Sequence, residues 1–224
     1  MENNNRPWWH FWQCSRCDRG KEDNARQKIL EAAFNEIHRV GFQAASIQNI
    51  LKETELTKGA LYYHFPNKLA LGYAVVDEVI RPLVEYHWIV PLQNAENPID
   101  ALIKAIMQGG EDMTIEDILS GCPLNNLSQE MSSIDEGFRT RTEGLYLDWR
   151  QAIETALEQG KQNNYVKQGV NTEQFAIVFV ATLEGCLSLA KSSQSKQILL
   201  SCGGGVISLL EGLRVETNKG DDNG

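Results

Sequence analysis

The sequence lacks several features that define other classes of protein. It has no strand-like alternation flanked by hairpin turn residues, no internal repeat, and no apolar run approaching the roughly 18–20 residues of a membrane span. Only four histidines are present, and no Ser-His-Asp order, phosphate-cradling glycine loop or HExxH motif occurs. The N-terminus also lacks the apolar core of a signal peptide, so we expect a cytoplasmic protein with no membrane partner.

The cysteine count and the distribution of charge narrow the class of protein further. The five cysteines are an odd number, which argues against a disulfide framework. The net charge of −9 is unusual for a nucleic-acid binder, but it is unequally distributed. Residues 1–68 hold ten Lys/Arg against eight Asp/Glu, whereas residues 69–224 hold eleven against twenty-two. The sequence therefore joins a mildly basic N-terminal part to a strongly acidic remainder.

Apolar residues recur with a helical period along most of the chain, which predicts an all-α fold. In residues 25–40, for example, Ile29, Ala33, Phe34 and Ile37 share one helical stripe. Pro82, with Pro91 and Pro98, is expected to interrupt the helices that follow. The predicted helices span 25–40, 47–53, 58–64, 68–80, 83–93, 98–108, 123–131, 135–162, 171–192 and 195–213.

The N-terminal helices are short and have clear end signals. Ser46, Thr57 and Asn67 are typical N-cap residues, Gly41 suits a helix C-terminus, and Phe65 precedes a proline that ends the helix before it. A helix, a tight turn and a second short helix form the helix-turn-helix arrangement, in which the second helix enters the DNA major groove. The adjacent aromatic rings in TKGALYYHF (57–65) then make sense, because some of them face DNA rather than the core.

Residues 24–70 carry a family resemblance. The segments RQKILEAAFNEIHRVGFQAASIQNIL and LTKGALYYHFPNKLAL closely resemble the DNA-binding head of the tetracycline-repressor (TetR) family of transcriptional regulators. This resemblance implies a three-helix helix-turn-helix domain and a larger helical ligand-binding and dimerisation domain. It further implies a homodimer that binds a palindromic double-stranded DNA operator and is released, most often as a repressor, by a small-molecule effector. No cofactor is expected.

The resemblance also assigns roles to individual residues. Leu61 and Phe65 would be core residues that hold the recognition helix in place. One departure is Glu55, which stands in the turn where the family usually has glycine. A positive φ at Glu55 would cost about 1 kcal/mol and place a carboxylate near DNA. The residues expected to contact DNA are Ser46, Gln48, Thr57, Lys58, Gly59, Ala60, Tyr62, Tyr63, His64 and Lys68.

The predicted domain organisation has four parts: an extension or arm at 1–22, the head at 23–82, the body at 83–214 and a tail at 215–224. The GCPLNNL segment (121–127) and the long helix after it resemble the ligand domain of one branch of the same family. An apolar pocket with a few polar groups, suited to a small hydrophobic or aromatic effector, is therefore expected in the body, and modification of a thiol is the other expected release signal. Its candidate residues, each of which could instead be core, are Tyr86, Trp88, Met113, Cys122, Phe138, Tyr146, Trp149 and Phe179.

The last two helices are expected to form the dimer interface as a four-helix bundle. Segment 175–190 is nearly apolar all round, which indicates burial on more than one side. Three consecutive glycines, 203–205, predict either a kink or, by preference, a close helix crossing. The candidate interface residues are Phe175, Phe179, Thr182, Cys186, Leu199, Gly203, Val206 and Leu210.

The cysteines leave alternatives open. Cys14 and Cys17 form a lone CxxC pair, which lacks two of the four ligands of a structural zinc site, so we predict no metal site. The N-terminal arm that contains them could instead be a leader or a basic arm on DNA. Cys122, at a helix start, could sense oxidants or pack as a small buried residue. A thiol-dependent enzyme using Cys122 and His87, and a helical adaptor that has lost DNA binding, are the alternative functions.

Overall fold

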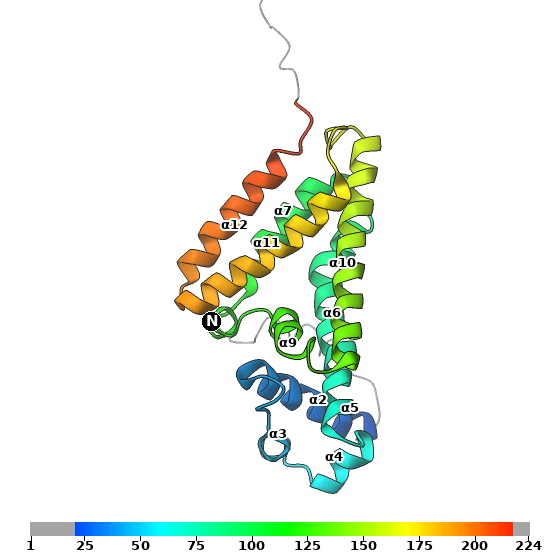
Figure 1. Ribbon diagram of the computed structural model, residues 1–224, viewed down its shortest axis with the longest axis vertical. Coiled ribbons are helices and arrows are strands. Elements are labelled where there is room, and N and C mark those ends of the chain that lie inside the picture. Colours follow the sequence, from blue (N-terminus) through cyan, green and yellow to red (C-terminus); the bar gives the residue numbers. More distant parts are fainter. Residues whose placement is uncertain (1–20, 217–224) are drawn as a thin grey trace, which may run out of the picture.

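The computed structural model describes residues 21–216, and over these residues the all-α prediction is confirmed. Figure 1 shows a small head at one end of an elongated body. The strand-like pairing between Val166 and Arg214 is an isolated bridge. The head contains α2 (Lys21–Val40), α3 (Ile47–Thr54), α4 (Lys58–His64) and α5 (Lys68–Val75).

Local signals set the helix ends of the head, as predicted. Ser46, Thr57 and Asn67 each precede a helix, and each side chain accepts a hydrogen bond from a first-turn backbone N–H, at 3.2, 3.2 and 2.8 Å. Gly41 follows α2 with a φ of 84°, a left-handed conformation that glycine adopts without a steric penalty. Phe65 is extended before the proline, with φ −134° and ψ 108°.

The helix that leaves the head does not stop at Pro82, so the predicted interruption is wrong. In a regular α-helix the ring of Pro82 would clash with the carbonyl of residue 78. A π-helical turn, η2 (Val76–Ile80), precedes the proline and widens the backbone there. The helical run continues through α6 (Arg81–Val84), η3 (Glu85–Ile89) and η4 (Val90–Leu92). The predicted domain boundary at residue 82 therefore falls inside a helical run that links head and body.

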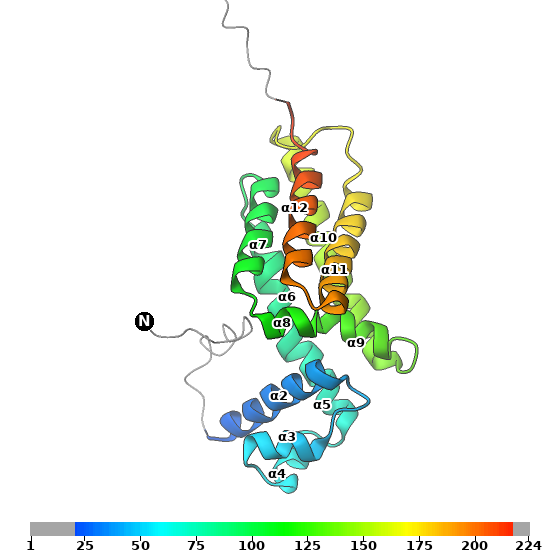
Figure 2. The ribbon, with the colours of Figure 1, turned by 90° about the vertical axis from the view of Figure 1, so that its left-hand side faces the viewer.

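The body is a layered helical bundle. In Figure 1 the long helix α10 runs up one side of the body, and α11 lies beside α12 in both Figure 1 and Figure 2. The short helix α8, held by a capping box between Thr114 and Asp117, is not predicted from the sequence. The body helices are α7 (Pro98–Asp112), α8 (Ile115–Ser120), α9 (Pro123–Met131), α10 (Glu136–Gln162), α11 (Thr172–Ser193) and α12 (Lys196–Glu211).

Helices α11 and α12 are the most apolar of the body. By length and composition alone α11 could cross a membrane, although no membrane-spanning segment is predicted from the sequence. In the structure α11 packs between α10 and α12. Helix α12 is unbroken across its three glycines. A Cβ added to Gly204 or Gly205 would meet no atom within 4 Å. The predicted close crossing therefore does not occur within the protomer.

An aromatic cluster joins the head to the body. Phe138 at the start of α10 is fully buried, and its ring lies 4.6 Å from Phe42 and 5.1 Å from Tyr73, between ring centroids. Gly72 makes this possible, because a Cβ there would lie 2.4 Å from the Phe42 ring and 2.7 Å from Phe138. The Tyr73 hydroxyl donates to Asp135 at 2.8 Å. This joint fixes the head against α10 through side chains of both parts.

Candidate functional site

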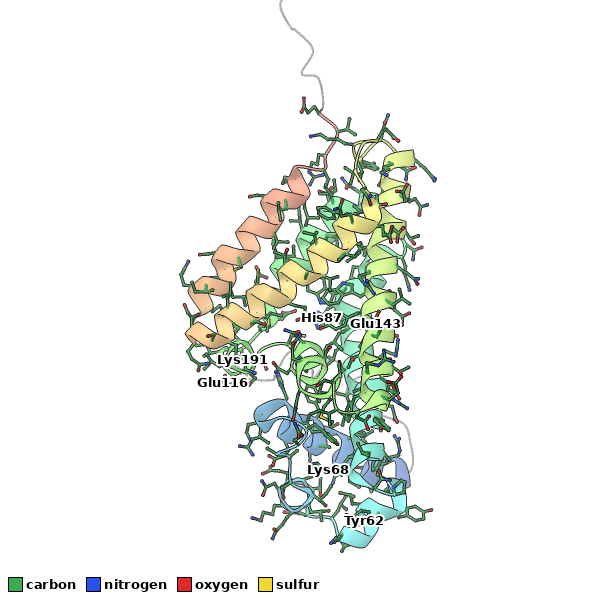
Figure 3. All side chains as sticks on the ribbon, viewed as in Figure 1. Tyr62, Lys68, His87, Glu116, Glu143 and Lys191 are labelled. Carbon is green, nitrogen blue, oxygen red and sulfur yellow. The ribbon has the colours of Figure 1, made fainter. Side chains whose placement is uncertain are left out.

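The end of the head farthest from the body carries an exposed polar and aromatic face. Tyr62 is 41% exposed and Tyr63 is 75% exposed, and Figure 3 shows Tyr62 at this end. Lys58, at the first turn of α4, lies over the Tyr62 ring, with its Nζ 5.7 Å from the centroid. Gly59 is exposed, and a Cβ there would meet only Thr57 Oγ1, at 3.8 Å. Packing inside the head therefore does not require this glycine.

Buried residues on the opposite side of α4 hold this face outward. Leu61 is fully buried and Phe65 is 2% exposed, which confirms both as core residues. Arg26 on α2 lies over the Phe65 ring at 5.0 Å, and it forms a two-point ion pair with Glu78 at 2.5 Å. The recognition helix is thus packed onto a rigid neighbour, although it has only seven residues.

The remaining predicted DNA contacts occupy different positions. Ser46 and Thr57 already cap helices, and Gln48 is exposed on the first turn of α3. Ala60 and His64 are half-buried on α4. These five residues lie on or beside the two helices of the helix-turn-helix unit.

Lys68 departs from the expected pattern. Its Nζ donates to the carbonyl of Gln43 at 3.0 Å and lies 4.9 Å from the Phe42 ring. Partial burial lowers the pKa of Lys68, although Glu130 and Glu36 oppose this. The ammonium group therefore already has partners within the head, in contrast to the exposed Lys58.

The turn between the paired helices has the strained conformation that the sequence predicts for a missing glycine. Glu55 has φ 57° and ψ 18°, the left-handed region. Its side chain is exposed. The left-handed conformation therefore costs about 1 kcal/mol, and the turn carries a carboxylate at the head surface.

The body contains a cavity of about 520 Å³, a volume suited to a drug-sized ligand. The Trp88 and Trp149 rings stack beside it, with centroids 5.2 Å apart and planes inclined at 29°. Met113 and Cys122 also line it, so four of the eight candidate pocket residues do so. Leu199, Gly203 and Cys186, predicted for the dimer interface, line the cavity as well.

The other four candidates lie elsewhere. Phe138 belongs to the joint between head and body, because α10 begins at the head and not beside the cavity. Tyr86 is 53% exposed on the outer side of its helix. Phe179 packs behind Trp88 at 6.3 Å between ring centroids. Tyr146 lies behind the cavity wall, where its hydroxyl donates to Glu184 at 3.4 Å.

Glu184 on α11 lines the cavity and is not among the residues predicted from the sequence. It is 7% exposed, and one of its oxygens, Oε1, accepts from Tyr146 and from the Cys122 thiol at 3.3 Å. Its other oxygen, Oε2, is buried and has no hydrogen-bond partner among the described residues. Burial raises the pKa of Glu184 to about 7, against the effect of its two donors. A single carboxyl within the apolar segment 175–190 was the available signal.

The Cys122 thiol is not positioned as a reactive thiolate. Burial, and then the nearby Glu184 charge, raise the pKa of Cys122 well above its ordinary value, because both disfavour a second negative charge. His87 lines the same cavity, and burial lowers its pKa. The thiol instead donates to Glu184 and accepts from a backbone N–H of α9. This environment disfavours the thiol-enzyme alternative.

Two hydrogen-bonded contacts connect the cavity side of the body to the head. His38 on α2 donates from Nε2 to the carbonyl of Gly121 at 2.7 Å, directly before Cys122. Glu130 on α9 accepts from the backbone N–H groups of Phe42 and Gln43 at 2.7 and 2.8 Å. A movement at Cys122 would therefore reach α2 through one peptide unit and one side chain.

The residues that α11 and α12 expose to solvent differ from the residues predicted for the dimer interface. Phe179, Cys186, Val206 and Leu210 are buried inside the protomer, at 6% exposure or less, so they offer no surface to a partner. Helix periodicity could not separate the two sides of these helices, since both are apolar. Phe175, Thr182, Leu199 and Gly203 are half-buried. The exposed large apolar residues of the two helices are Ile177, Val178, Leu189, Ile198, Leu200 and Leu209.

Metal chemistry finds no support in the part of the chain that the structure describes. Between residues 21 and 216 there is no group of three or more His, Cys, Asp or Glu side chains arranged to hold a metal ion. Cys14 and Cys17, the lone CxxC pair, lie outside the described residues.

Comparison with known proteins agrees with this geometry. Residues 29–75 match the family model "Bacterial regulatory proteins, tetR family", and residues 98–200 match "Tetracyclin repressor-like, C-terminal domain". The chain is 32% identical over 178 residues to an HTH-type transcriptional regulator in the lacX 3' region of Lactococcus lactis subsp. lactis. That alignment spans 80% of this chain and 89% of the relative.

Solved structures share the fold. A TetR-family regulator from Cytophaga hutchinsonii superposes with a TM-score of 0.77 at 20% identity, over 89% of this chain and 100% of that one. The reduced form of Escherichia coli NemR superposes with a TM-score of 0.71 at 23% identity, over 85% and 97% of the two chains. Together with the helix-turn-helix head and the cavity-bearing body, these matches show that the chain belongs to the TetR family of DNA-binding transcriptional regulators.

Proposed function

We propose that this protein is a cytoplasmic repressor that binds a palindromic operator as a homodimer and is released by a small molecule in the body cavity. The observation that carries the proposal is the outward face of α4. Lys58, Tyr62 and Tyr63 are exposed there, while Leu61 and Phe65 anchor the helix from behind. Hydroxyl and ammonium groups at a helix-turn-helix face are typical contacts to DNA phosphates and bases.

The predicted DNA contacts fall into two groups, according to whether the side chain is exposed or is already engaged within the head. Lys58, Tyr62, Tyr63 and Gln48 are exposed, and we assign them to direct contact with the operator. Gly59 would allow close approach of a phosphate to the backbone. The remaining candidates, which have a capping role or are half-buried, would support or supplement these contacts: Ser46, Thr57, Ala60, His64 and Lys68.

The direct test is fluorescence anisotropy of labelled DNA from the region upstream of the gene, titrated at two salt concentrations. A repressor should bind this DNA more tightly than random DNA, with an affinity that falls as salt rises. Equal binding to both DNAs, with the fold intact, would favour the adaptor alternative, for which the exposed Glu55 carboxylate in the turn is the supporting observation.

The exposed apolar residues of α11 and α12 support the homodimer. Surface patches of this kind on a monomer mark interaction sites. Gly205 has open space above it, so a second copy of α12 could pack closely at this point, whereas Gly204 lines the cavity. We therefore propose an interface built on Val178, Leu189, Leu209 and Gly205.

Sedimentation velocity of Val178→Asp tests the interface, because a buried unpaired carboxylate should dissociate the dimer. Ile134→Asp is the control, since Ile134 is similarly exposed, at 59%, in the turn before α10. If the Val178→Asp variant remains a dimer while the Ile134→Asp variant becomes a monomer, the interface lies on another face of the protein.

The cavity supports small-molecule release, and its wall contacts suggest the route. Cys122 lines the cavity, and the preceding carbonyl, of Gly121, accepts the His38 hydrogen bond from the head. A ligand that displaces Cys122 would pull or free α2 and thereby reorient the paired helices. Release by thiol modification is the weaker alternative, because the Cys122 pKa is raised and its sulfur is engaged with Glu184.

A further inference from the structure

The polar groups of the cavity wall are few, and they point to one class of ligand. The walls are mostly apolar and include the stacked side chains of Trp88 and Trp149. Glu184 is buried among them, and its Oε2 atom has no hydrogen-bond partner within the described residues. A buried carboxylate without a counter-charge is costly, which creates a demand for a positive charge beside Glu184.

The donors that already reach Glu184 do not meet this demand. The Cys122 thiol and the Tyr146 hydroxyl both donate to Oε1, at 3.3 and 3.4 Å, which are long distances for charge-assisted hydrogen bonds. Neither group carries a positive charge. The carboxyl is thus held in position by two neutral donors, while its second oxygen has no hydrogen-bond partner among the described residues.

The other charged residues of the cavity wall favour a cation too. Glu111 and Asp112, at the end of α7, line the cavity, and Lys196 is the basic residue that lines it. His87 is held neutral, since burial lowers its pKa. With Glu184 ionised the wall has an excess of negative charge. The electron-rich indole faces add to it, because aromatic rings attract organic cations.

We propose that the effector is an organic monocation, an amine or quaternary ammonium on an aromatic or aliphatic body, whose charge lies beside Glu184 and whose body lies along Trp88 and Trp149. This inference rests on the proposed function of the cavity as the effector site.

Matched probes test the sign of the charge. Isothermal titration of the full chain at pH 8 would compare (2-phenylethyl)trimethylammonium with its neutral isostere (3,3-dimethylbutyl)benzene and with the anion 4-phenylbutanoate. The ammonium should bind at least about tenfold more tightly than the isostere, since the two differ only in charge. Equal or tighter binding of the isostere or the anion, or no binding of the ammonium, overturns the cation assignment.

Two variants test whether Glu184 is the source of the preference for the ammonium probe. Glu184→Gln should remove the preference for the ammonium and leave binding of the isostere within about threefold. Glu116→Gln is the matched control, because it removes the same charge from an exposed position on α8, labelled in Figure 3. A preference that survives Glu184→Gln would overturn the assignment. Circular dichroism of both variants checks that they fold.

The pH dependence gives an independent readout. Below pH 7 Glu184 takes up a proton, so ammonium affinity should fall by up to about tenfold per pH unit. The titratable groups that bond to Glu184 are the Cys122 thiol and the Tyr146 hydroxyl, whose raised pKa values keep them neutral here. The other titratable residues that line the cavity are His87, Glu111, Asp112 and Lys196. Affinity that stays constant from pH 8 to pH 6 would overturn the proposal.

Operator binding by the unliganded protein is measured separately, so a failure of the proposed ligand class is distinguishable from a failure of the proposed regulator function.

Discussion

The head and the body of this protein place their functional residues in opposite ways. In the head the candidate contacts are on the outside of a short helix whose inner side is anchored by Leu61 and Phe65. In the body the candidate contacts line an interior cavity, and the decisive polar group, Glu184, is 7% exposed. The comparison teaches that surface function follows local sequence order, whereas interior function depends on which distant helices meet.

The joint between the two parts should be the most sensitive point. Phe138→Ala removes a fully buried ring that packs on Phe42 and Tyr73, and we expect a loss of about 3–5 kcal/mol of unfolding free energy. Tyr63→Ala, which truncates an exposed ring, should change stability by less than about 0.5 kcal/mol. Chemical denaturation of both variants measures the difference. Similar losses for the two would mean that the head and the body do not share this core.

The buried carboxyl should make stability depend on pH. Because the pKa of Glu184 is raised to about 7 from an ordinary 4.5, the folded state binds its proton more tightly than the unfolded state does. Its contribution is therefore fully present below about pH 4.5 and is lost as pH rises through 7, by at most about 3 kcal/mol. Glu184→Gln should lack this loss between pH 5 and pH 8, while Glu116→Gln should retain it in thermal melts. Identical pH profiles for wild type and Glu184→Gln would refute the assignment.

The face of the recognition helix should affect binding and not folding. Tyr63→Ala and Lys58→Ala are each expected to weaken operator binding by about tenfold, the effect of losing one or two polar contacts. Anisotropy titrations with the upstream DNA measure this, and unchanged melting temperatures provide the control. Wild-type affinity in both variants would remove these residues from the interface.

The smallest expected effect separates the two lysines of the head. Lys58→Ala should flatten the dependence of log affinity on log salt by about one unit, because an exposed ammonium releases one counterion at a phosphate. Lys68→Ala should flatten it by less, since Lys68 is already bonded to the Gln43 carbonyl at 3.0 Å. Equal slopes for the two variants would indicate that Lys68 leaves this bond when DNA binds.

Much of the head is predictable because its signals are local. The capping side chains of Ser46, Thr57 and Asn67 act within three residues of their own positions, so the order of residues is enough to place the helix ends. The left-handed conformation of Glu55 is likewise anticipated, because the family resemblance places Glu55 where glycine is usual. The family resemblance itself also rests on this contiguous segment.

The body is less predictable, since the same apolar residue suits a core, a pocket or an interface. Phe138, Phe179 and Trp149 are all aromatic residues on predicted helices, yet the first joins the head, the second packs behind Trp88, and the third lines the cavity. Pro82 illustrates the same limit, because a π-helical turn several residues earlier lets the helix pass through it.

The sequence by itself determined the all-α class, the helix-turn-helix unit, its caps and the family, because these depend on periodicity and on contacts within a few residues. Only the tertiary structure decided that Glu184 meets Cys122 and Tyr146, that four candidate interface residues are interior, and that Lys68 is engaged within the head. The physical reason is that each of these depends on side chains brought together from separate helices. Their environment, and with it their charge state, is set by packing that residue order alone does not specify.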